Sequence, residues 1–484
     1  MSPAQKSNGA DYTVPFFLNG KEHLTQKRFE VKSPVTGEVL HYCSSASSKD
    51  VTKAVESASE ALKTWRAMTP SRRRDIFLKA AEVMESRREE LAQNMIDETG
   101  ATPAWAGFNL HVAVDFIKDV AGRISSIEGM LPSTADEGLG AMVLKEPYGV
   151  VLAIAPWNAP YILATRAVAF PLAAGNTVIL KASELSPKTI SGVVSCFHEA
   201  GIPDGVLNML VHAPADAPAI TAQLIGDPNV RKINFTGSTA VGRVIAKLAG
   251  EHLKPVLLEL GGKAPAIVWE DANLEQAANA CAMGSFFHAG QICMSTERIL
   301  VHKNVRTEFE KQFAAAIEQM FPSTGDAPTL IAAGGVEKNK RLLQDALSKG
   351  AALVTGDPNA ADGPNKTTMR PVVISNVTPE MDIYHTESFG PTVSVIEIDS
   401  EEEALRIAND TEYGLTSSVF TEDLRRGLRL ARQIETGAVH INGMTVHDEA
   451  ALPHGGTKAS GFGRFNTSVG LQEWLKTKNI TFKY

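Results

Sequence analysis

The sequence has little cysteine: only 4 of its 484 residues are cysteines, and no two of them form a Cys-x-x-Cys pair. Cysteines this few and this scattered do not build a disulfide framework, and their spacing suits neither a zinc site nor a dithiol redox centre. Long apolar runs are also absent, because none approaches the roughly 18 residues that a membrane span needs. We therefore expect no metal and no membrane partner.

Positive charge is not in excess either. Lys and Arg total 47 against 55 Asp and Glu, which gives a formal net charge of -8. Nucleic acids and anionic membranes are bound through basic surfaces, so this balance argues against both as partners. Residues 1–17 lack the apolar stretch of a secretory signal and the Arg-rich character of a transit peptide, and the final residues carry no peroxisomal or retention address. We expect a soluble, cytoplasmic protein.

What is present is the composition of an ordinary globular protein, with 44% hydrophobic and 21% charged residues. The length suggests about three domains. Apolar residues recur at three- and four-residue spacings in residues 51–65, and similar patterns predict helices over residues 71–95 and 112–122. A short strand pair is expected before them, within residues 15–31.

From residue 149 onwards the pattern changes to short apolar runs bounded by Pro and Gly, which alternate with longer helical patterns. Strands that are apolar throughout and alternate with helices are typical of a parallel sheet covered on both faces, which is a doubly wound α/β domain. The expected strands span residues 150–154, 177–180, 206–211, 230–235 and 256–260, and the expected helices span residues 160–173, 187–200, 217–225 and 238–249.

A second α/β region is expected after residue 261. Residues 131–146 differ from both regions, since their Pro, Ser, Thr and Gly content suits a hairpin or an extended arm, and residues 477–483 alternate weakly like a strand. Because an unpaired strand edge invites pairing, both segments are candidates to extend the sheet of a partner. The second region is predicted to contain strands at 266–269 and 299–301, helices at 274–287 and 306–320, and further elements to about residue 441.

Cys293 is the cysteine best placed for chemistry. An unpaired cysteine is usually a small buried hydrophobe, and Cys43, Cys196 and Cys281 fit that description. Cys293 instead lies in the segment HAGQICMSTER, after a predicted helix and before a predicted strand, with Gly290 allowing close approach of the backbone. A cysteine on a loop at the edge of a sheet is placed to meet a substrate.

Two polar residues follow predicted strands of the first sheet, where α/β folds place their sites. Glu259, in LELGGK, ends an apolar strand, and burial there would raise the pKa of its carboxyl toward the range of a general base. The alternative is an exposed acid on a turn. Asn158, in PWN, would donate its amide to a developing oxyanion, or serve as a plain turn residue.

Three further motifs are weak when each is taken alone. Lys181 and Glu184, in LKASE, follow a strand, and a charge pattern at a helix start would explain them equally well. The run GSTAVG, from Gly237 to Gly242, lies between a strand and a helix, where free backbone N–H groups attract phosphate, but it is not the GxGxxG pattern. The run ESFGP, Glu387–Pro391, places an acid and an aromatic ring ahead of a strand.

Taken together, PWN, LKASE, FTGS, LELGGK, GQIC and ESFGP, in this order and at these separations, resemble the aldehyde dehydrogenase superfamily. So does the closing PHGGTKASGFGRF, Pro453–Phe465. The resemblance runs from about Phe16 to the C-terminus and implies oxidation of an aldehyde to a carboxylic acid, without a metal. It also implies the family's homodimer or homotetramer and its fold: a doubly wound NAD-binding domain (residues 1–127 and 148–260), a second α/β catalytic domain (261–467) and a small β oligomerisation arm (128–147 and 468–484).

This resemblance gives three residues catalytic roles. Cys293 is the nucleophile, whose thiolate adds to the aldehyde carbon and which carries the acyl group as a thioester after hydride transfer to the cofactor. Asn158 and the backbone N–H of Cys293 would hold the oxyanion. Glu259 would activate the water that hydrolyses the thioester.

The same resemblance assigns a cofactor site. Lys181 and Glu184 would grip the adenine ribose, where a carboxylate accepts hydrogen bonds from the ribose hydroxyls and repels a 2′-phosphate, so we expect NAD rather than NADP. Two stretches depart from the family pattern: HAPADAP, at residues 212–218, lacks the usual glycines, and residues 321–335 look shortened. The other matched residues are Gly237, Ser238 and Gly242 under the pyrophosphate, Glu387 and Phe389 at the nicotinamide end, and Ile154 and Trp157 beside the adenosine.

The substrate assignment rests on TPAWAGFN, residues 102–109, which resembles the substrate channel of dehydrogenases for aromatic aldehydes such as salicylaldehyde, vanillin and benzaldehyde. Aromatic walls from Trp105 and Phe108, with Arg166 bonding a ring hydroxyl, would suit a hydroxybenzaldehyde. The alternative is that the two rings only pack a helix and Arg166 makes an ordinary ion pair. A broad-specificity or aliphatic aldehyde dehydrogenase then remains open.

Two rivals belong to other classes of function. One is a cysteine acyltransferase or esterase without redox chemistry, against which the ribose pair at Glu184 argues, since such an enzyme needs no dinucleotide. The other is a non-catalytic binding protein, against which the intact set of Asn158, Glu259 and Cys293 argues. Within the family, the branch that passes the acyl group to coenzyme A typically lacks a base like Glu259, so hydrolysis is expected.

Overall fold

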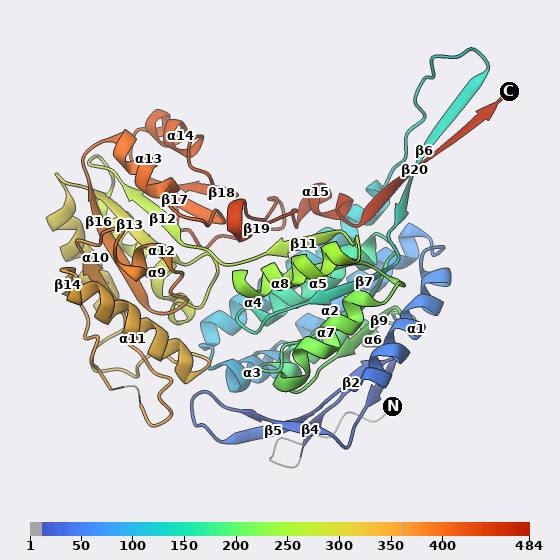
Figure 1. The fold of residues 1–484 in the computed structure, drawn as a ribbon, viewed down its shortest axis with the longest axis horizontal. Coiled ribbons are helices and arrows are strands. Elements are labelled where there is room, and N and C mark those ends of the chain that lie inside the picture. The colour runs from blue at the N-terminus through green and yellow to red at the C-terminus, as the bar shows by residue number, and fades with distance from the viewer. Residues whose placement is uncertain (1–11, 362) are drawn as a thin grey trace.

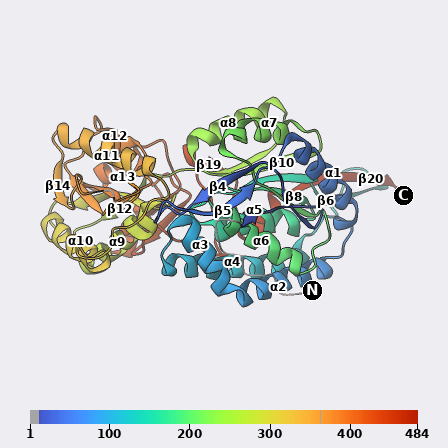
Figure 2. The same ribbon diagram turned by 90° about the horizontal axis from the view of Figure 1, so that it is seen from below.

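The computed structural model describes residues 12–361 and 363–484. Two bodies of helices and strands lie side by side, and a two-stranded arm that ends in the C-terminus projects from one of them (Figure 1). Seen from below, the body that contains α9 to α13 is separate from the one that contains α1 to α8 (Figure 2). Each body is built around its own sheet.

The larger body contains an eight-stranded sheet in the order β19-β11-β10-β7-β8-β9-β2-β3. The strands from β11 to β9 pair in parallel, which confirms the doubly wound arrangement predicted from the alternating apolar runs and helices. Antiparallel strands from distant parts of the chain form both edges. The bounds are β2 Phe16–Leu18, β3 Lys21–His23, β7 Val150–Ile154, β8 Thr177–Lys181, β9 Leu207–Leu210, β10 Val230–Thr236, β11 Val256–Glu259 and β19 Gly461–Phe462.

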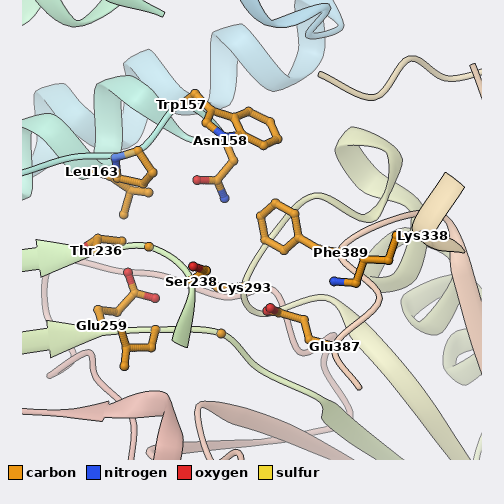
Figure 3. A pocket seen from close by; sticks show the side chains of 14 residues that line it. Trp157, Asn158, Leu163, Thr236, Ser238, Glu259, Cys293, Lys338, Glu387 and Phe389 are labelled. Atoms are coloured by element: carbon orange, nitrogen blue, oxygen red, sulfur yellow. The ribbon is translucent and has the colours of Figure 1, made fainter. Parts of the chain in front are cut away.

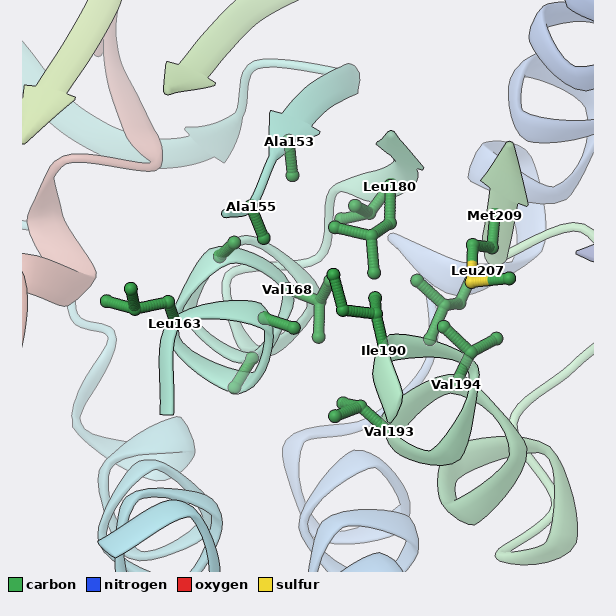
Figure 4. Close-up of a cluster of buried hydrophobic side chains, with 14 of the residues drawn as sticks. Ala153, Ala155, Leu163, Val168, Leu180, Ile190, Val193, Val194, Leu207 and Met209 are labelled. Carbon is green, nitrogen blue, oxygen red and sulfur yellow. The ribbon is translucent and has the colours of Figure 1, made fainter. Parts of the chain in front are cut away.

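Helices cover both faces of this sheet. Helices α5 and α6 pack against β7, β8 and β9, while α7 and α8 pack against β10 and α1 packs against α7 and β8. Figure 4 shows the buried layer in which Val168 of α5 and Ile190 of α6 meet Leu180 of β8. The bounds are α1 Ser48–Trp65, α5 Pro160–Ala173, α6 Pro187–Glu199, α7 Ala217–Gly226, α8 Thr239–Glu251 and α15 Thr467–Gln472.

Two helices on the outside of this body differ from the prediction. The helix expected over residues 71–95 is two helices, α2 (Pro70–Ser86) and α3 (Arg88–Thr99). The chain bends at Arg87, whose guanidinium hydrogen-bonds Glu90 and Ser195, so tertiary contacts fix a break that helix propensity does not reveal. The helix expected over residues 112–122 begins earlier, as α4 (Pro103–Arg123), because the Thr102 hydroxyl accepts from the Trp105 N–H and caps it.

The second body contains a seven-stranded sheet in the order β14-β15-β16-β13-β12-β17-β18, parallel except for β14. Successive strand residues enter different hydrophobic clusters, as Leu300 and Val301 do, so this sheet is also covered on both faces. The bounds are β12 Ala264–Val268, β13 Thr296–His302, β14 Ala352–Thr355, β15 Val372–Ser375, β16 Thr392–Ile398, β17 Thr416–Phe420, β18 Ala438–Ile441, α9 Leu274–Phe286, α10 Arg306–Met320, α11 Ala333–Ser348, α12 Asp382–His385, α13 Glu401–Asn409 and α14 Leu424–Ala431.

The arm consists of β6 (Leu139–Pro147) and β20 (Leu475–Lys483), which pair antiparallel with each other along their whole length. A strand pair near the N-terminus is also present, as β2–β3, and a separate small sheet joins β1 (Thr13–Val14), β4 (Arg28–Lys32) and β5 (Val39–Ser44). The predicted domain boundaries stay a prediction, although β19 lies in the first sheet while its residues were assigned to the second domain. In the part of the chain that the structure describes, no helix is long and apolar enough to span a membrane.

Candidate active site

A cavity of about 270 Å³ opens at the carboxyl ends of β7, β10 and β11, where the two bodies meet (Figure 3). In Figure 3 the Asn158 side chain projects toward the centre of the cavity, and the carboxylates of Glu259 and Glu387 lie across from it. The cavity brings together eight residues that the sequence singled out: Trp157, Asn158, Gly237, Ser238, Glu259, Cys293, Glu387 and Phe389.

Cys293 lies on the loop between a short 3-10 turn (Phe287–Gly290) and β13. The loop is tightly held: a Cβ on Gly262 would come within 2.3 Å of the Cys293 carbonyl oxygen, and His288 and Ala289 both have positive φ angles. Strained backbone of this kind clusters at functional sites. Burial, and secondarily the nearby Glu259 carboxylate, raise the pKa of the Cys293 thiol well above its usual value.

The Asn158 side chain is buried and oriented from two directions. Its Nδ2 donates to the Gln291 carbonyl at 3.0 Å, which leaves the second N–H of the amide for another acceptor. Its backbone carbonyl accepts from the indole N–H of Trp105 at 2.9 Å. A donor that is fixed before the substrate arrives is the arrangement that stabilises an oxyanion.

Glu259 ends β11 with only 1% of its surface exposed, and among the described residues neither carboxylate oxygen has a hydrogen-bond partner. The sequence-based expectation that burial raises the pKa of this carboxyl is wrong in its net direction. Burial does act upward, but His454 and Arg166 together outweigh it and lower the pKa below its usual value. His454 Nε2 lies 3.9 Å from Glu259 Oε1.

The turn between β10 and α8 forms the part of the wall next to Glu259. Gly237 and Ser238 line the cavity, and the Ser238 hydroxyl accepts from the Val241 N–H at the start of α8. Gly242 does not line the cavity, but a Cβ there would come within 2.5 Å of Leu260, so its lack of a side chain lets α8 lie close to the cavity wall. A 13-residue helix that begins at a cavity is a favourable place for a phosphate.

Glu387 and Phe389 close the far end. The Gly262 N–H donates to Glu387 Oε1 at 2.9 Å, and burial with the neighbouring Glu297 raises the pKa of Glu387 to about 7. Glu297 accepts one hydrogen bond from the Phe389 N–H at 3.1 Å and another from Lys263 at 2.5 Å. These bonds hold the segment that carries Glu387 and Phe389 in place.

The predicted ribose residues lie outside this cavity. Lys181 Nζ is 3.7 Å from the Glu184 carboxylate, and Glu184 lines a neighbouring cavity of about 410 Å³. Ile154 ends β7 and is buried. A dinucleotide nevertheless suits the residues present: Ser238 at the start of α8 and the Glu387 carboxyl group share the first cavity, and Glu184 follows β8, which pairs with β7.

The predicted substrate residues lie outside the cavity lining. Trp105 is buried and stacks on Phe108 and His288, with ring centroids 5.5 and 5.4 Å apart, and meets Phe287 edge-on. Arg166 is buried too, and its guanidinium pairs with Asp448, so the ion-pair alternative describes what is observed. Neither residue lines the cavity itself, and their substrate roles stay predictions.

Sequence reasoning missed several residues of the site. Lys338 of α11 lines the cavity, but no motif marks it, and Thr236 of β10 lines it too, although the motif FTGS that contains it indicated no role for it. His454 belongs to the closing motif PHGGTKASGFGRF, yet nothing in that motif indicated that it would lie beside Glu259.

A cavity at the carboxyl ends of the strands of a doubly wound sheet is where α/β folds bind their ligands, dinucleotides among them. The comparisons with known proteins make the class specific: the profile of the aldehyde dehydrogenase family matches residues 21–480, and the chain belongs to this family of oxidoreductases.

Two curated relatives are each 43% identical to the chain. The vanillin dehydrogenase of Pseudomonas sp. (strain HR199 / DSM 7063) aligns over 480 residues, 98% of each chain, and the salicylaldehyde dehydrogenase of Pseudomonas putida aligns over 465 residues, 95% of each. Among solved structures, a salicylaldehyde dehydrogenase from Pseudomonas putida G7 complexed with salicylaldehyde is 41% identical, covers 98% of both chains and superposes with a TM-score of 0.94.

Proposed function

We propose that this protein oxidises an aromatic aldehyde, such as salicylaldehyde, vanillin or benzaldehyde, to the carboxylic acid with NAD. The observation that carries the proposal is that Cys293, Glu259 and Asn158 open on one cavity together with the start of α8. A thiol next to a base and an oriented donor is the arrangement needed for covalent attack on a carbonyl.

Each residue has a defined task in this reaction. The Cys293 thiol loses its proton to solvent, and the thiolate sulfur bonds to the carbonyl carbon. The second N–H of the Asn158 amide, with the Cys293 N–H, holds the resulting oxyanion; losing one such donor typically costs about 10²–10³ in rate. A bound NAD supplies the acceptor for the hydride. Glu259 then takes a proton from the water that cleaves the thioester, which releases the acid and frees the sulfur.

NAD is proposed over NADP, although members of the family use either one. The support is Glu184, a carboxylate at the position matched to the adenine ribose, where its charge repels a 2′-phosphate. Lys181 balances only part of that charge, at 3.7 Å.

An aromatic substrate is proposed from the ring cluster of Trp105, Phe108, Phe287 and His288, which packs directly beside the Cys293 loop. The names of the curated relatives point the same way. We further propose that the enzyme works in the cytoplasm and as a homodimer or homotetramer whose contacts involve the β6–β20 arm.

The test combines a substrate panel with two variants. The wild type should form NADH with higher kcat/KM from salicylaldehyde, vanillin and benzaldehyde than from short aliphatic aldehydes. Cys293→Ala should lose turnover while still binding NAD, and Glu259→Gln should give a burst of NADH and then stall as the acyl-enzyme. Cys281→Ala is the matched control, since it removes a buried thiol of α9 outside the cavity.

Two results would contradict the proposal. Full activity in Cys293→Ala would remove the nucleophile, and ester cleavage without any NADH from the aldehydes would favour a cysteine acyltransferase or esterase. A Glu259→Gln variant without a burst would show that Glu259 acts before the thioester forms.

A further inference from the structure

Next to Glu259 lies a buried row of polar side chains that the proposed mechanism does not use. His454 Nε2 is 3.9 Å from Glu259 Oε1, and His454 Nδ1 is 3.9 Å from Asp448 Oδ1. Asp448 in turn pairs with Arg166. The row therefore runs from a carboxylate through an imidazole to a second carboxylate and a guanidinium.

The far end of the row is rigid. Asp448 Oδ1 accepts from Asn466 Nδ2 at 3.1 Å, and the Arg166 guanidinium lies 5.1 Å from the Phe116 ring and 5.3 Å from the Phe465 ring. The pair with Arg166 is buried, so each of its two charges is compensated by the other.

The position of His454 is fixed by its backbone. The His454 N–H donates to the Phe465 carbonyl at 3.0 Å, and the Phe465 N–H donates to the His454 carbonyl at 2.7 Å. The His454 side chain is only 9% exposed, and its Nε2 has no hydrogen-bond partner among the described residues. A buried ring nitrogen without a partner is costly, so it calls for an explanation.

The charged and titratable groups around this ring come from four directions. The nearest groups are Glu259 at the end of β11, Asp448, and Arg166, which lies in α5. Two groups act on the ring from further away: Arg464, and His440, which lies in β18. Among them, only Glu259 opens on the cavity. A proton that enters the row from the cavity therefore passes through Glu259.

We propose that His454 is the positioning residue of Glu259 and the acceptor of the proton that Glu259 removes from the hydrolytic water. This inference rests on the proposed function. The water oxygen bonds to the thioester carbon, the carbon–sulfur bond breaks, and the sulfur leaves as the Cys293 thiolate with the bonding pair. One proton of the water moves to Glu259 and on to His454 Nε2, and it returns along the same two groups to the thiolate, which restores the resting thiol.

The chemistry of the two groups explains why a relay is needed. Glu259 is held as a weak base, because its pKa lies below the usual value, and it retains a proton poorly. Burial and Arg166 lower the pKa of His454 as well, but from a higher ordinary value, about 6.5 against about 4.3 for a glutamate. Passing the proton to His454 returns Glu259 to its charged form while the thiolate leaves.

The experiment uses the full-length protein with NAD and salicylaldehyde and compares the burst of NADH with the steady state. His454→Phe keeps an aromatic ring of similar volume but carries no proton. We expect its burst to stay within threefold of the wild type and its steady-state rate to fall about 100-fold, a usual contribution of one acid–base group. His454→Gln, which keeps hydrogen bonding but not basicity, should be nearly as slow.

The pH profile gives a readout that a purely structural role would not change. In the wild type, the steady-state rate should fall at low pH as His454 becomes protonated and loses its capacity to accept. Burial and Arg166 lower the pKa of His454, so this fall lies below about pH 6.5. The burst of the wild type should show no such fall at low pH, and the steady-state rate of His454→Phe should show none either. His302→Phe is the matched control, because His302 is a buried histidine of β13 whose ring packs on Trp269.

The outcomes separate this inference from the proposed function. A wild type that forms no NADH from any aldehyde of the panel overturns the function itself. If the wild type is active but its steady-state rate shows no pH dependence beyond that of the burst, only the relay is overturned. This outcome needs no variant. The relay is also overturned if His454→Gln restores the wild-type rate, or if both variants lose burst and turnover in equal measure.

Discussion

Buried charge decides what single residues of the site can do. The thiolate of Cys293 would form beside the carboxylate of Glu259, and like charges oppose one another at short range. Arg166 acts on both groups, although it does not line the cavity. The guanidinium therefore serves as a counter-charge placed behind the reacting groups, and this is a use for Arg166 other than contact with the substrate.

This balance predicts a shift in the reactivity of the thiol. Glu259→Gln removes a negative charge that raises the pKa of Cys293, so the thiolate fraction at a given pH should increase. We expect alkylation of Cys293 by iodoacetamide to reach its plateau at lower pH than in the wild type. Cys293→Ala measures the background from the three buried cysteines. A profile that stays in place or moves to higher pH would contradict the electrostatic coupling.

We expect the choice between NAD and NADP to depend on a single residue as well, Glu184. Glu184→Gln removes the charge that repels a 2′-phosphate and leaves Lys181 uncompensated, so the ratio of kcat/KM for NADP to that for NAD should rise at least about tenfold, mainly through the KM for NADP. Glu199→Gln, at an exposed position at the end of α6, is the control. An unchanged ratio would mean that Glu184 does not face the ribose.

The residues that follow strands were the ones that the sequence could locate. Asn158 and Glu259 come directly after β7 and at the end of β11, and parallel strands end at one edge of a sheet, so their meeting follows from a local rule. Arg166 and His454 are different. Their partners, Asp448 and Glu259, are distant in the sequence, and no periodicity carries that information.

At the scale of elements, the link between β11 and β12 controls the position of the Cys293 loop. Gly262→Ala would put a Cβ within 2.3 Å of the Cys293 carbonyl oxygen, so the loop must move. A displacement of about 1 Å costs up to about 10²-fold in rate, and overpacking costs about 1–3 kcal/mol of stability. We expect kcat/KM to fall at least about tenfold, measured alongside the melting temperature.

The matched control for this change is Gly250→Ala. Gly250 lies near the end of α8, and a Cβ added there would have no neighbouring atom within 4 Å. Alanine favours a helix over glycine by about 0.5–1 kcal/mol. This variant should therefore keep its activity and melt slightly higher. Equal activity in the two variants would show that the contact with Cys293 does not position the loop.

Elements were predictable where one pattern dominated. The strands β7 to β11 are buried on both faces, so their apolar runs and the intervening helices were clear from the sequence, and the structure confirms them. The break at Arg87 and the early start of α4 at Pro103 were missed. The first depends on a contact with Ser195 of another helix, and the second on a single cap at Thr102.

At the scale of the whole molecule, the site exists only because the two bodies meet. Cys293, Glu387 and Phe389 come from the second body, and Asn158, Ser238 and Glu259 come from the first. Neither sheet alone forms the cavity, and β19 and α15 return the end of the chain to the first body. Loss of contact between the bodies would therefore abolish activity.

The β6–β20 arm projects from the first body and carries exposed apolar side chains. Residues opposite each other in a two-stranded ribbon share a face, and the register pairs Met142 with Ile480 and Gly140 with Phe482, so Ile480 and Phe482 lie on one face. Both are substantially exposed, at 37% and 44%. An isolated two-stranded ribbon is only marginally stable in water, so an apolar face on a projecting arm favours contact with another copy of the chain.

The exposed apolar face of the arm predicts a change of mass in solution when a charge is placed on it. Ile480→Lys places a charge on the apolar face, and burying an unpaired charge in an interface is strongly unfavourable. We expect the variant to give a smaller species than the wild type by light scattering coupled to size-exclusion chromatography, most clearly at low protein concentration, where mass action opposes assembly. Thr481→Lys adds the same charge on the opposite face of β20 and should leave the mass unchanged, because successive strand residues point to opposite sides. If Ile480→Lys keeps the wild-type mass, or if both variants dissociate alike, the apolar face of the arm is not the surface that joins the subunits.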